Sequence, residues 1–111
     1  MQTELDALRL ILAKEHSFSP KMRYLSPSHE SMVPLLIWLS AYFKQKEARM
    51  FPPEQREARL RMINFICETS VESFYDMTSW QISAITNFLK DIEEEEYGKA
   101  NRFLDFVETC C

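Results

Sequence analysis

The chain has 111 residues, a length that fits one domain with a modest hydrophobic core. Apolar residues make up 46% and aromatic residues 13%, which excludes a disordered chain, and we expect one helical domain over residues 1–111. The net charge of −4 disfavours a general affinity for DNA or for an anionic membrane.

This charge is unevenly distributed along the chain. Residues 1–40 are balanced, with four acids and four bases. Residues 41–62 carry six bases and three acids, whereas residues 63–111 carry ten acids and three bases. We therefore expect a dipolar molecule with a basic middle segment and an acidic C-terminal half.

The chain contains a single glycine. Glycine supplies the positive φ angles of hairpin turns and of loops that approach phosphate closely, so its scarcity argues against β-meanders, Rossmann folds and P-loops. The sequence therefore predicts an all-α fold, a compact bundle of four to five helices.

The first predicted helix covers residues 4–15. Thr3 and Asp6 have the spacing of a capping box, and apolar residues follow at helical intervals. A long connection is expected over residues 17–31, because its two Ser-Pro pairs bias their serines away from the α conformation.

The next two predicted helices cover residues 32–49 and 53–75. Ser31 is a suitable N-cap for the first of them and leaves Pro34 in the first turn, where a missing N–H is harmless. Apolar residues surround most of that helix, which predicts a central position in the bundle. Pro53 suits the first position of the following helix.

The strongest local signal is a capping box at Thr78 and Gln81, which predicts the start of a further helix. Gly98 is suited to ending that helix with a positive φ angle. A short last helix over residues 99–109 is expected to turn Phe103 and other apolar residues inward.

Candidates for catalysis or metal binding are few. His16 and His29 are the only histidines, and neither has the acid spacing of an HExxH or ExxH motif. Glu68, Glu72 and Asp76 recur every four residues, and on one helical face they would form a row of carboxylates. An enzyme would require folding to assemble such scattered groups, so we expect no enzymatic activity, catalytic residue, metal or cofactor.

The three cysteines form no CxxC pair, and two of them are adjacent at the end of the chain. This odd number is a poor disulfide framework, and we expect a cytoplasmic protein. Cys67 fits a small core residue, and Cys110 with Cys111 fits an exposed tail, with lipid modification as the alternative. The longest apolar run, residues 33–43, is too short to cross a bilayer.

Four consecutive glutamates occupy residues 93–96, near the predicted C-terminus of a helix. The helix dipole disfavours anions there, and closely spaced like charges destabilise a helix, so the stability of that helix does not explain them. Solubility is one interpretation; the other is an acidic surface that attracts a basic partner and uses nearby aromatic rings as anchors. The predicted partner-binding residues are Asp91, Glu93, Glu94, Glu95, Glu96, Tyr97 and Phe103.

The basic middle segment supports an alternative, a nucleic-acid-binding regulator with a helix-turn-helix arrangement. Glu54 and Glu57 interrupt the basic segment, and the turn within it lacks glycine, which weakens this interpretation. The residues that would contact nucleic acid are Lys44, Lys46, Arg49, Arg56, Arg59 and Arg61.

We therefore predict a small protein-binding module, such as a regulator, inhibitor, adaptor or immunity-type factor, that meets a basic protein through its acidic C-terminal half. A homodimer is a separate prediction, because seven large side chains exceed what so small a core is expected to hold. These side chains are Trp38, Tyr42, Phe43, Met50, Phe51, Trp80 and Phe88.

Overall fold

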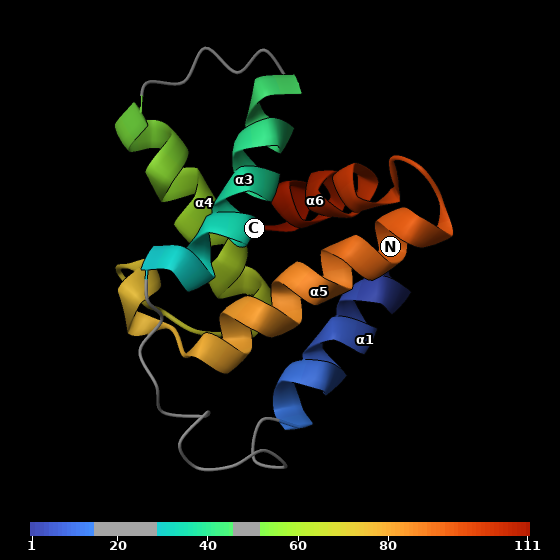
Figure 1. Ribbon diagram of the computed structural model, residues 1–111, viewed down its shortest axis with the longest axis horizontal. Helices are drawn as coiled ribbons and strands as arrows, with labels where there is room; N and C mark the ends of the chain where they lie inside the picture. Colours follow the sequence, from blue (N-terminus) through green and yellow to red (C-terminus); the bar gives the residue numbers. More distant parts are fainter. Residues whose placement is uncertain (15–28, 46–51) are drawn as a thin grey trace.

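The computed structural model describes residues 1–14, 29–45 and 52–111, without the side chains of residues 29–31, 45, 52 and 53. Within these ranges the chain forms five α-helices and no strand, so the predicted all-α fold is confirmed there. None of the helices in these ranges is long and apolar enough to cross a membrane. The elements are α1 (Gln2–Ala13), α3 (His29–Gln45), α4 (Pro52–Cys67), the short 3-10 helix η2 (Phe74–Asp76), α5 (Ser79–Glu95) and α6 (Lys99–Cys110) (Figure 1).

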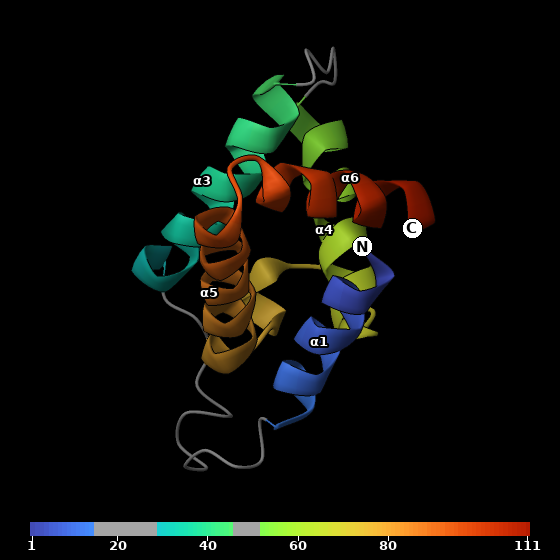
Figure 2. The same cartoon turned by 90° about the vertical axis from the view of Figure 1, so that its right-hand side faces the viewer.

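Helix α5 makes contacts with three of the other four helices. It packs against α1, α3 and α6, while α4 packs against α1 and α6. Figure 2 shows α6 running crosswise to α5, and the chain reverses between them in a sharp turn at the right of Figure 1. Residues far apart in sequence therefore meet at the ends of helices as well as in the core.

All five helices contribute side chains to one hydrophobic core. Each helix presents apolar residues at intervals of three and four, which places them on one face. The rings of Phe88 on α5 and Phe103 on α6 meet edge to face, with centroids 5.4 Å apart. Among the fully buried residues are Leu5, Leu8, Leu35, Leu39, Met62, Ile63, Ile66, Ile85, Leu89, Phe103 and Val107.

The two predicted capping boxes have opposite outcomes. At the start of α5 the box is confirmed: the backbone N–H of Gln81 donates to Thr78 Oγ1 over 3.1 Å, and the Thr78 N–H donates to Gln81 Oε1 over 2.9 Å. At the start of α1 it is wrong, because the helix begins at Gln2 and its cap, Met1, makes no side-chain hydrogen bond.

Helix α3 differs from its prediction in two respects. It begins at His29, so Pro34 lies inside the helix rather than in its first turn. The predicted central position is also wrong, since Ile37 on the outer face is 62% exposed. Only one face of this apolar helix is buried in the core.

Helix α4 ends at Cys67, well before the predicted end at residue 75. The side chain of Asn64 replaces helical hydrogen bonds: its Nδ2 donates to Val71 O over 2.9 Å, and its Oδ1 accepts from Val71 N over 3.0 Å and from Thr69 Oγ1 over 2.9 Å. Glu68 takes a φ of 57°, which turns the chain out of the helix.

This early end separates the three acids that a longer helix would have aligned. Glu68, Glu72 and Asp76 lie in the connection after α4, so the predicted carboxylate row on one helical face is wrong. Within the described ranges, no group of three or more histidine, cysteine or acidic side chains is placed to hold a metal ion.

Candidate functional site

The acidic turn, residues 91–98, joins the last turns of α5 to the start of α6. Gly98 has a φ of 84°, the positive angle predicted for it. Its predicted place directly at the end of the preceding helix is wrong, because the C-cap of α5 is Glu96 and Gly98 is the N-cap of α6. The N–H of Lys99 donates to Glu96 O over 3.0 Å, and the N–H of Arg102 donates to Gly98 O over 3.1 Å. The glutamates at the end of α5 therefore lie beside the beginning of α6.

Glu93 has a structural role in this turn. Its Oε1 accepts a 2.5 Å hydrogen bond from the backbone N–H of Gly98, the N-cap of α6. The first N–H groups of a helix lack intrahelical acceptors and favour a nearby anion. The expectation concerned the helix that carries the glutamates, and Glu93 instead contributes to the start of the next helix.

Two further glutamates pair with bases of α6. Glu95 Oε2 lies 2.6 Å from Lys99 Nζ, and Glu96 Oε2 lies 2.9 Å from Arg102 Nη2. Lys99 Nζ also lies 3.8 Å from Glu4 Oε1 on α1. The hydrogen bond to Glu95 raises the pKa of Lys99, although burial opposes this shift. Part of the acidic run is therefore neutralised by the protein's own cations.

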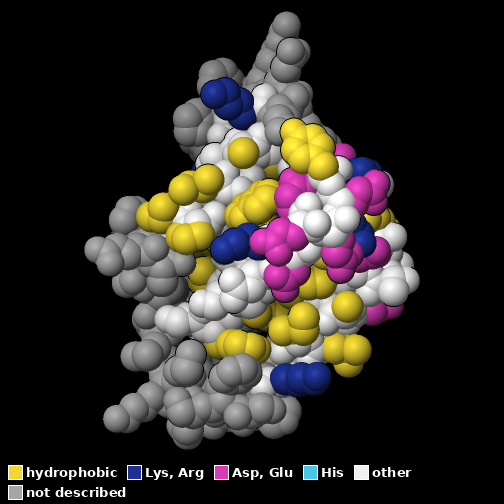
Figure 3. Space-filling view, turned by 45° about the vertical axis from the view of Figure 1, so that its right-hand side comes forward, with side chains coloured by type: hydrophobic (Ala, Val, Ile, Leu, Met, Phe, Trp, Pro, Cys, Tyr) yellow, Lys and Arg dark blue, Asp and Glu magenta, His cyan; other side chains and the backbone are white. Residues whose placement is uncertain are grey.

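Asp91 and Glu94 remain available to a partner. Both side chains are exposed, and neither forms an ion pair with any residue of the described ranges. Tyr97, three residues after Glu94, is 93% exposed. Figure 3 shows acidic side chains gathered on this face, interrupted by basic ones and bordered by hydrophobic ones. The turn thus carries two exposed carboxylates, without an ion pair among the described residues, and an exposed aromatic ring.

Phe103 does not belong to this surface. It is 0% exposed and packs against Phe88 in the core. The inward orientation expected for the last helix is confirmed, and Phe103 is excluded as an exposed anchor because α5 covers it.

The predicted nucleic-acid residues do not form one face of α4. Arg56 and Arg61 are exposed, whereas Arg59 is half-buried and donates its Nε to Gln55 O over 3.3 Å. At about 100° per residue, Arg61 lies roughly 140° around the helix from Arg56 and close to the line of Glu57. Lys44 is exposed on α3.

Two members of that set, Lys46 and Arg49, lie outside the described residues, as does His16; the side chain of His29 is also outside them. The structure brings the arginines of α4 together with Glu54 and Glu57, which are exposed on the same helix. This mixture of charges gives the nucleic-acid alternative no specific support.

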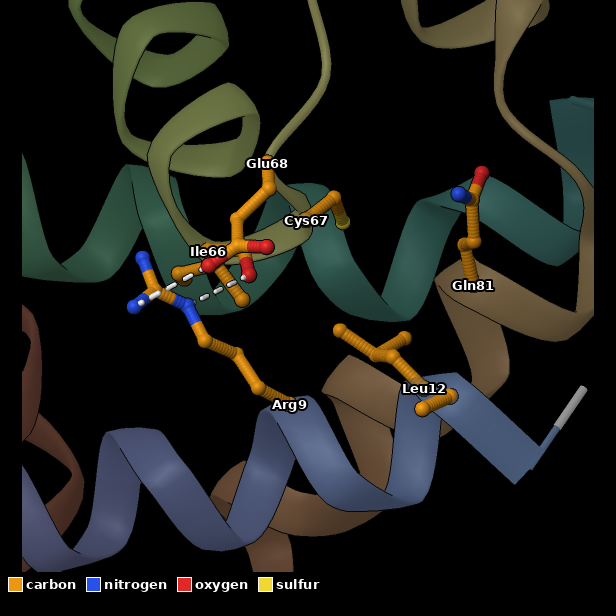
Figure 4. Close-up of a pocket in the computed structure, with 7 residues that line it drawn as sticks. Arg9, Leu12, Ile66, Cys67, Glu68 and Gln81 are labelled. Atoms are coloured by element: carbon orange, nitrogen blue, oxygen red, sulfur yellow. Dashed lines mark hydrogen bonds and ion pairs between the residues drawn. The ribbon is translucent and has the colours of Figure 1, made fainter.

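A hollow of about 200 Å³ lies between α1, the end of α4 and the start of α5 (Figure 4). Arg9 occupies one side of it and donates to the carbonyl oxygens of Phe65 and Ile66 over 2.7 and 3.3 Å. Its Nη1 lies 3.4 Å from Glu68 Oε1. Arg9 thus binds carbonyl oxygens at the end of α4, and its guanidinium links α1 to that end.

Cys67 also lines this hollow, with its side chain half-buried. Catalysis by a thiol requires an adjacent base. The described lining consists of Arg9, Leu12, Ala13, Ile66, Cys67, Glu68 and Gln81, and its only carboxylate, that of Glu68, is paired with Arg9. The described part of the hollow is a gap where α1, α4 and α5 pack together, with no arrangement of groups that indicates catalysis.

One polar cluster, between α3 and α6, was not predicted from the sequence. Tyr42 of α3 is 2% exposed, and its hydroxyl lies 2.9 Å from Asp105 Oδ1 and also contacts Glu108 of α6. These partners are more than sixty residues apart in sequence, so no local pattern could have indicated them. The cluster satisfies a buried hydroxyl group at the contact between α3 and α6.

The chain was compared with protein-family models, with curated proteins and with solved structures, and none of the three comparisons found a match.

Proposed function

We propose that the protein acts by binding another protein, and that the contact includes Asp91, Glu94 and Tyr97 of the acidic turn. The observation that supports this proposal is the 93% exposure of the Tyr97 ring in a turn where Asp91 and Glu94 are exposed and make no ion pair with another described residue. Exposed tyrosines are frequent anchors of protein interfaces, because they bury a large area and lose little conformational entropy.

The chemistry of this surface favours a partner with a basic patch. Asp91 and Glu94 attract lysine and arginine side chains and accelerate the encounter, while the ring supplies apolar contact. Glu93, Glu95 and Glu96 are left out of the proposed contact, since they already bind Gly98, Lys99 and Arg102 within the protein. Regulators, inhibitors, adaptors and immunity-type factors all work by such contacts.

A charge reversal that spares the turn tests this proposal. The double variant Asp91→Lys with Glu94→Lys should weaken binding to the basic partner at least about tenfold, because repulsion replaces attraction at the interface. The matched control is Glu72→Lys with Asp76→Lys, which changes the net charge equally at two exposed acids outside the turn.

The measurement is quantitative affinity capture from an extract of the source cells, followed by calorimetry with the purified partner at two salt concentrations. Tyr97→Ala should also weaken binding, without the salt dependence of the acidic pair. The proposal fails if the partner binds the Asp91 and Glu94 double variant as tightly as it binds the control. Circular dichroism confirms that each variant remains folded.

A further inference from the structure

Two cations of α6 bind glutamates of the acidic turn, and they differ in how firmly they are fixed. Lys99 has a side chain that is 19% exposed and lies between two carboxylates, 2.6 Å from Glu95 Oε2 and 3.8 Å from Glu4 Oε1 on α1. It therefore connects α1, α5 and α6, and its pair with Glu95 belongs to the fold.

Arg102 is fixed less firmly than Lys99. Its side chain is 49% exposed, and its one ion pair within the described ranges joins it to Glu96, whose side chain is 65% exposed. An ion pair between exposed groups stabilises a fold only weakly, because water solvates both charges. Glu96 can therefore exchange Arg102 for another cation with little effect on the stability of the protein.

Glu96 adjoins the residues proposed to bind the partner. It immediately precedes Tyr97, and its extended backbone, with φ −156° and ψ 127°, leads out of α5 into the turn. Asp91 and Glu94 are exposed in the last turns of α5. Figure 3 shows basic side chains among the acidic ones on this face. A partner that covers Tyr97 therefore approaches the Glu96 carboxylate and meets the positive charge of Arg102 beside it.

We propose, on the basis of the function proposed above, that Arg102 determines the selectivity of the acidic turn by competing with the partner's bases for Glu96. Its guanidinium repels an approaching base, and a base that displaces it gains only what Arg102 loses. A partner with scattered bases therefore binds weakly. In a dense basic patch, bases bound to Asp91 and Glu94 keep a further base close to Glu96, where its high local concentration favours the exchange. The acidic turn therefore selects a partner whose lysine or arginine residues are closely spaced.

Two peptides with the same number of lysines test this selectivity: oligolysine, and a peptide with glycines between the lysines. Their dissociation constants are measured by NMR titration of the isotope-labelled protein at about 20 mM salt, where screening is weak. Wild type should prefer oligolysine. Arg102→Gln should bind the spaced peptide at least about threefold more tightly, because Glu96 is then unpaired, and its preference for oligolysine should narrow. Arg56→Gln, at an exposed arginine of α4, is the matched control with the same change of charge.

Glu96→Gln, added to Arg102→Gln, should abolish this gain in affinity, because the released carboxylate is removed. The role of Arg102 is overturned if Arg102→Gln and Arg56→Gln bind the spaced peptide equally, or if the gain persists without Glu96. The spectra also show that each variant is folded.

The double variant Asp91→Lys with Glu94→Lys separates this role from the proposed function in the same titration. If the double variant loses binding while Arg102→Gln matches its control, the contact surface stands without the role of Arg102. If the double variant binds oligolysine as tightly as wild type does, the proposed contact surface fails, and the role of Arg102 fails with it.

Discussion

Two helix ends in this molecule use the same backbone conformation with different residues. After α4 the chain turns through Glu68 at a φ of 57°, and before α6 it turns through Gly98 at 84°. Glycine adopts such angles without steric penalty, whereas a residue with a Cβ adopts them at a cost of about 1–2 kcal/mol. The first turn therefore needs support that the second does not.

That support comes from side chains outside the turn itself. Asn64 binds the backbone at Val71, and Arg9 reaches the carbonyls of Phe65 and Ile66 from α1. At the acidic turn, the glycine avoids the backbone strain, and the ion pairs of Lys99 and Arg102 stabilise the turn further. The comparison shows that tertiary contacts can stabilise a turn that lacks glycine. The local sequence does not predict such a turn, because the contacts come from distant residues.

The largest effect is expected from Asn64→Ala, which removes three hydrogen bonds from the end of α4. We expect the free energy of unfolding to fall by about 2–3 kcal/mol, because the backbone groups of Val71 lose their partners. Urea unfolding followed by circular dichroism measures it. Asn87→Ala, at an exposed position of α5, is the control, and an equal loss in both variants would contradict this role of Asn64.

Arg9→Met should have the next largest effect, a loss of about 1–2 kcal/mol. Methionine keeps the aliphatic part of the side chain but cannot donate to Phe65 O and Ile66 O. Arg9→Lys retains the charge without the two-pronged geometry, so its unfolding midpoint should fall between those of wild type and Arg9→Met. A midpoint unchanged in Arg9→Met would show that the end of α4 does not depend on Arg9.

Gly98→Ala should destabilise the protein by about 1 kcal/mol through backbone strain. An added Cβ would meet Arg102 Nη1 at 3.8 Å, an ordinary contact, so no steric clash contributes. Gly98→Asn should lose less, because asparagine tolerates positive φ angles better than alanine does. Thermal unfolding compares Gly98→Ala with Gly98→Asn. Equal melting temperatures for the two variants would rule out backbone strain as the cause of the loss.

Glu68→Gly should act in the opposite direction and stabilise the protein by up to about 1 kcal/mol, since it relieves the strain at φ 57°. The ion pair lost with Arg9 matters little, because the Glu68 side chain is 69% exposed. Glu72→Gly, in the same connection but without a positive φ, should not stabilise. A fall in the unfolding midpoint of Glu68→Gly would show that Glu68 is not strained.

The smallest effect concerns pH and the contact between α1 and the acidic turn. The pKa of Glu4 is lowered, first by a backbone hydrogen bond and then by the N-terminal ammonium group and Lys99, against the opposing effect of burial. A lowered pKa means that Glu4 stabilises the fold above pH 4.5, its ordinary value, and that this contribution is lost as the pH falls below it.

Glu4→Gln should therefore be less stable than wild type by roughly 0.2–1 kcal/mol at pH 6, with the difference shrinking toward pH 3. Urea unfolding at both pH values measures the difference. Glu72→Gln, at an exposed acid outside this contact, is the matched control. If the stability difference between wild type and Glu4→Gln grew toward pH 3, the lowered pKa of Glu4 would be contradicted.

The candidate site was only partly predictable from sequence. The exposure of Asp91, Glu94 and Tyr97 agrees with their prediction as surface residues. For Asp91 and Glu94 the reason is local, because ionised carboxylates on either side of the buried Ile92 are costly to bury. The division of the glutamates was not predictable. It depends on α6 folding back so that Gly98, Lys99 and Arg102 bind Glu93, Glu95 and Glu96.

The sequence by itself determined the all-α class, the capped start of α5 and the positive φ at Gly98, because helical periodicity, capping and glycine conformation act within a few residues. Only the tertiary structure decided where α4 ends, which face of α3 is exposed, and how Tyr42 meets Asp105 and Glu108. Each of these depends on side chains brought together from distant parts of the chain, and hydrogen bonding and burial depend on spatial neighbours rather than on sequence neighbours.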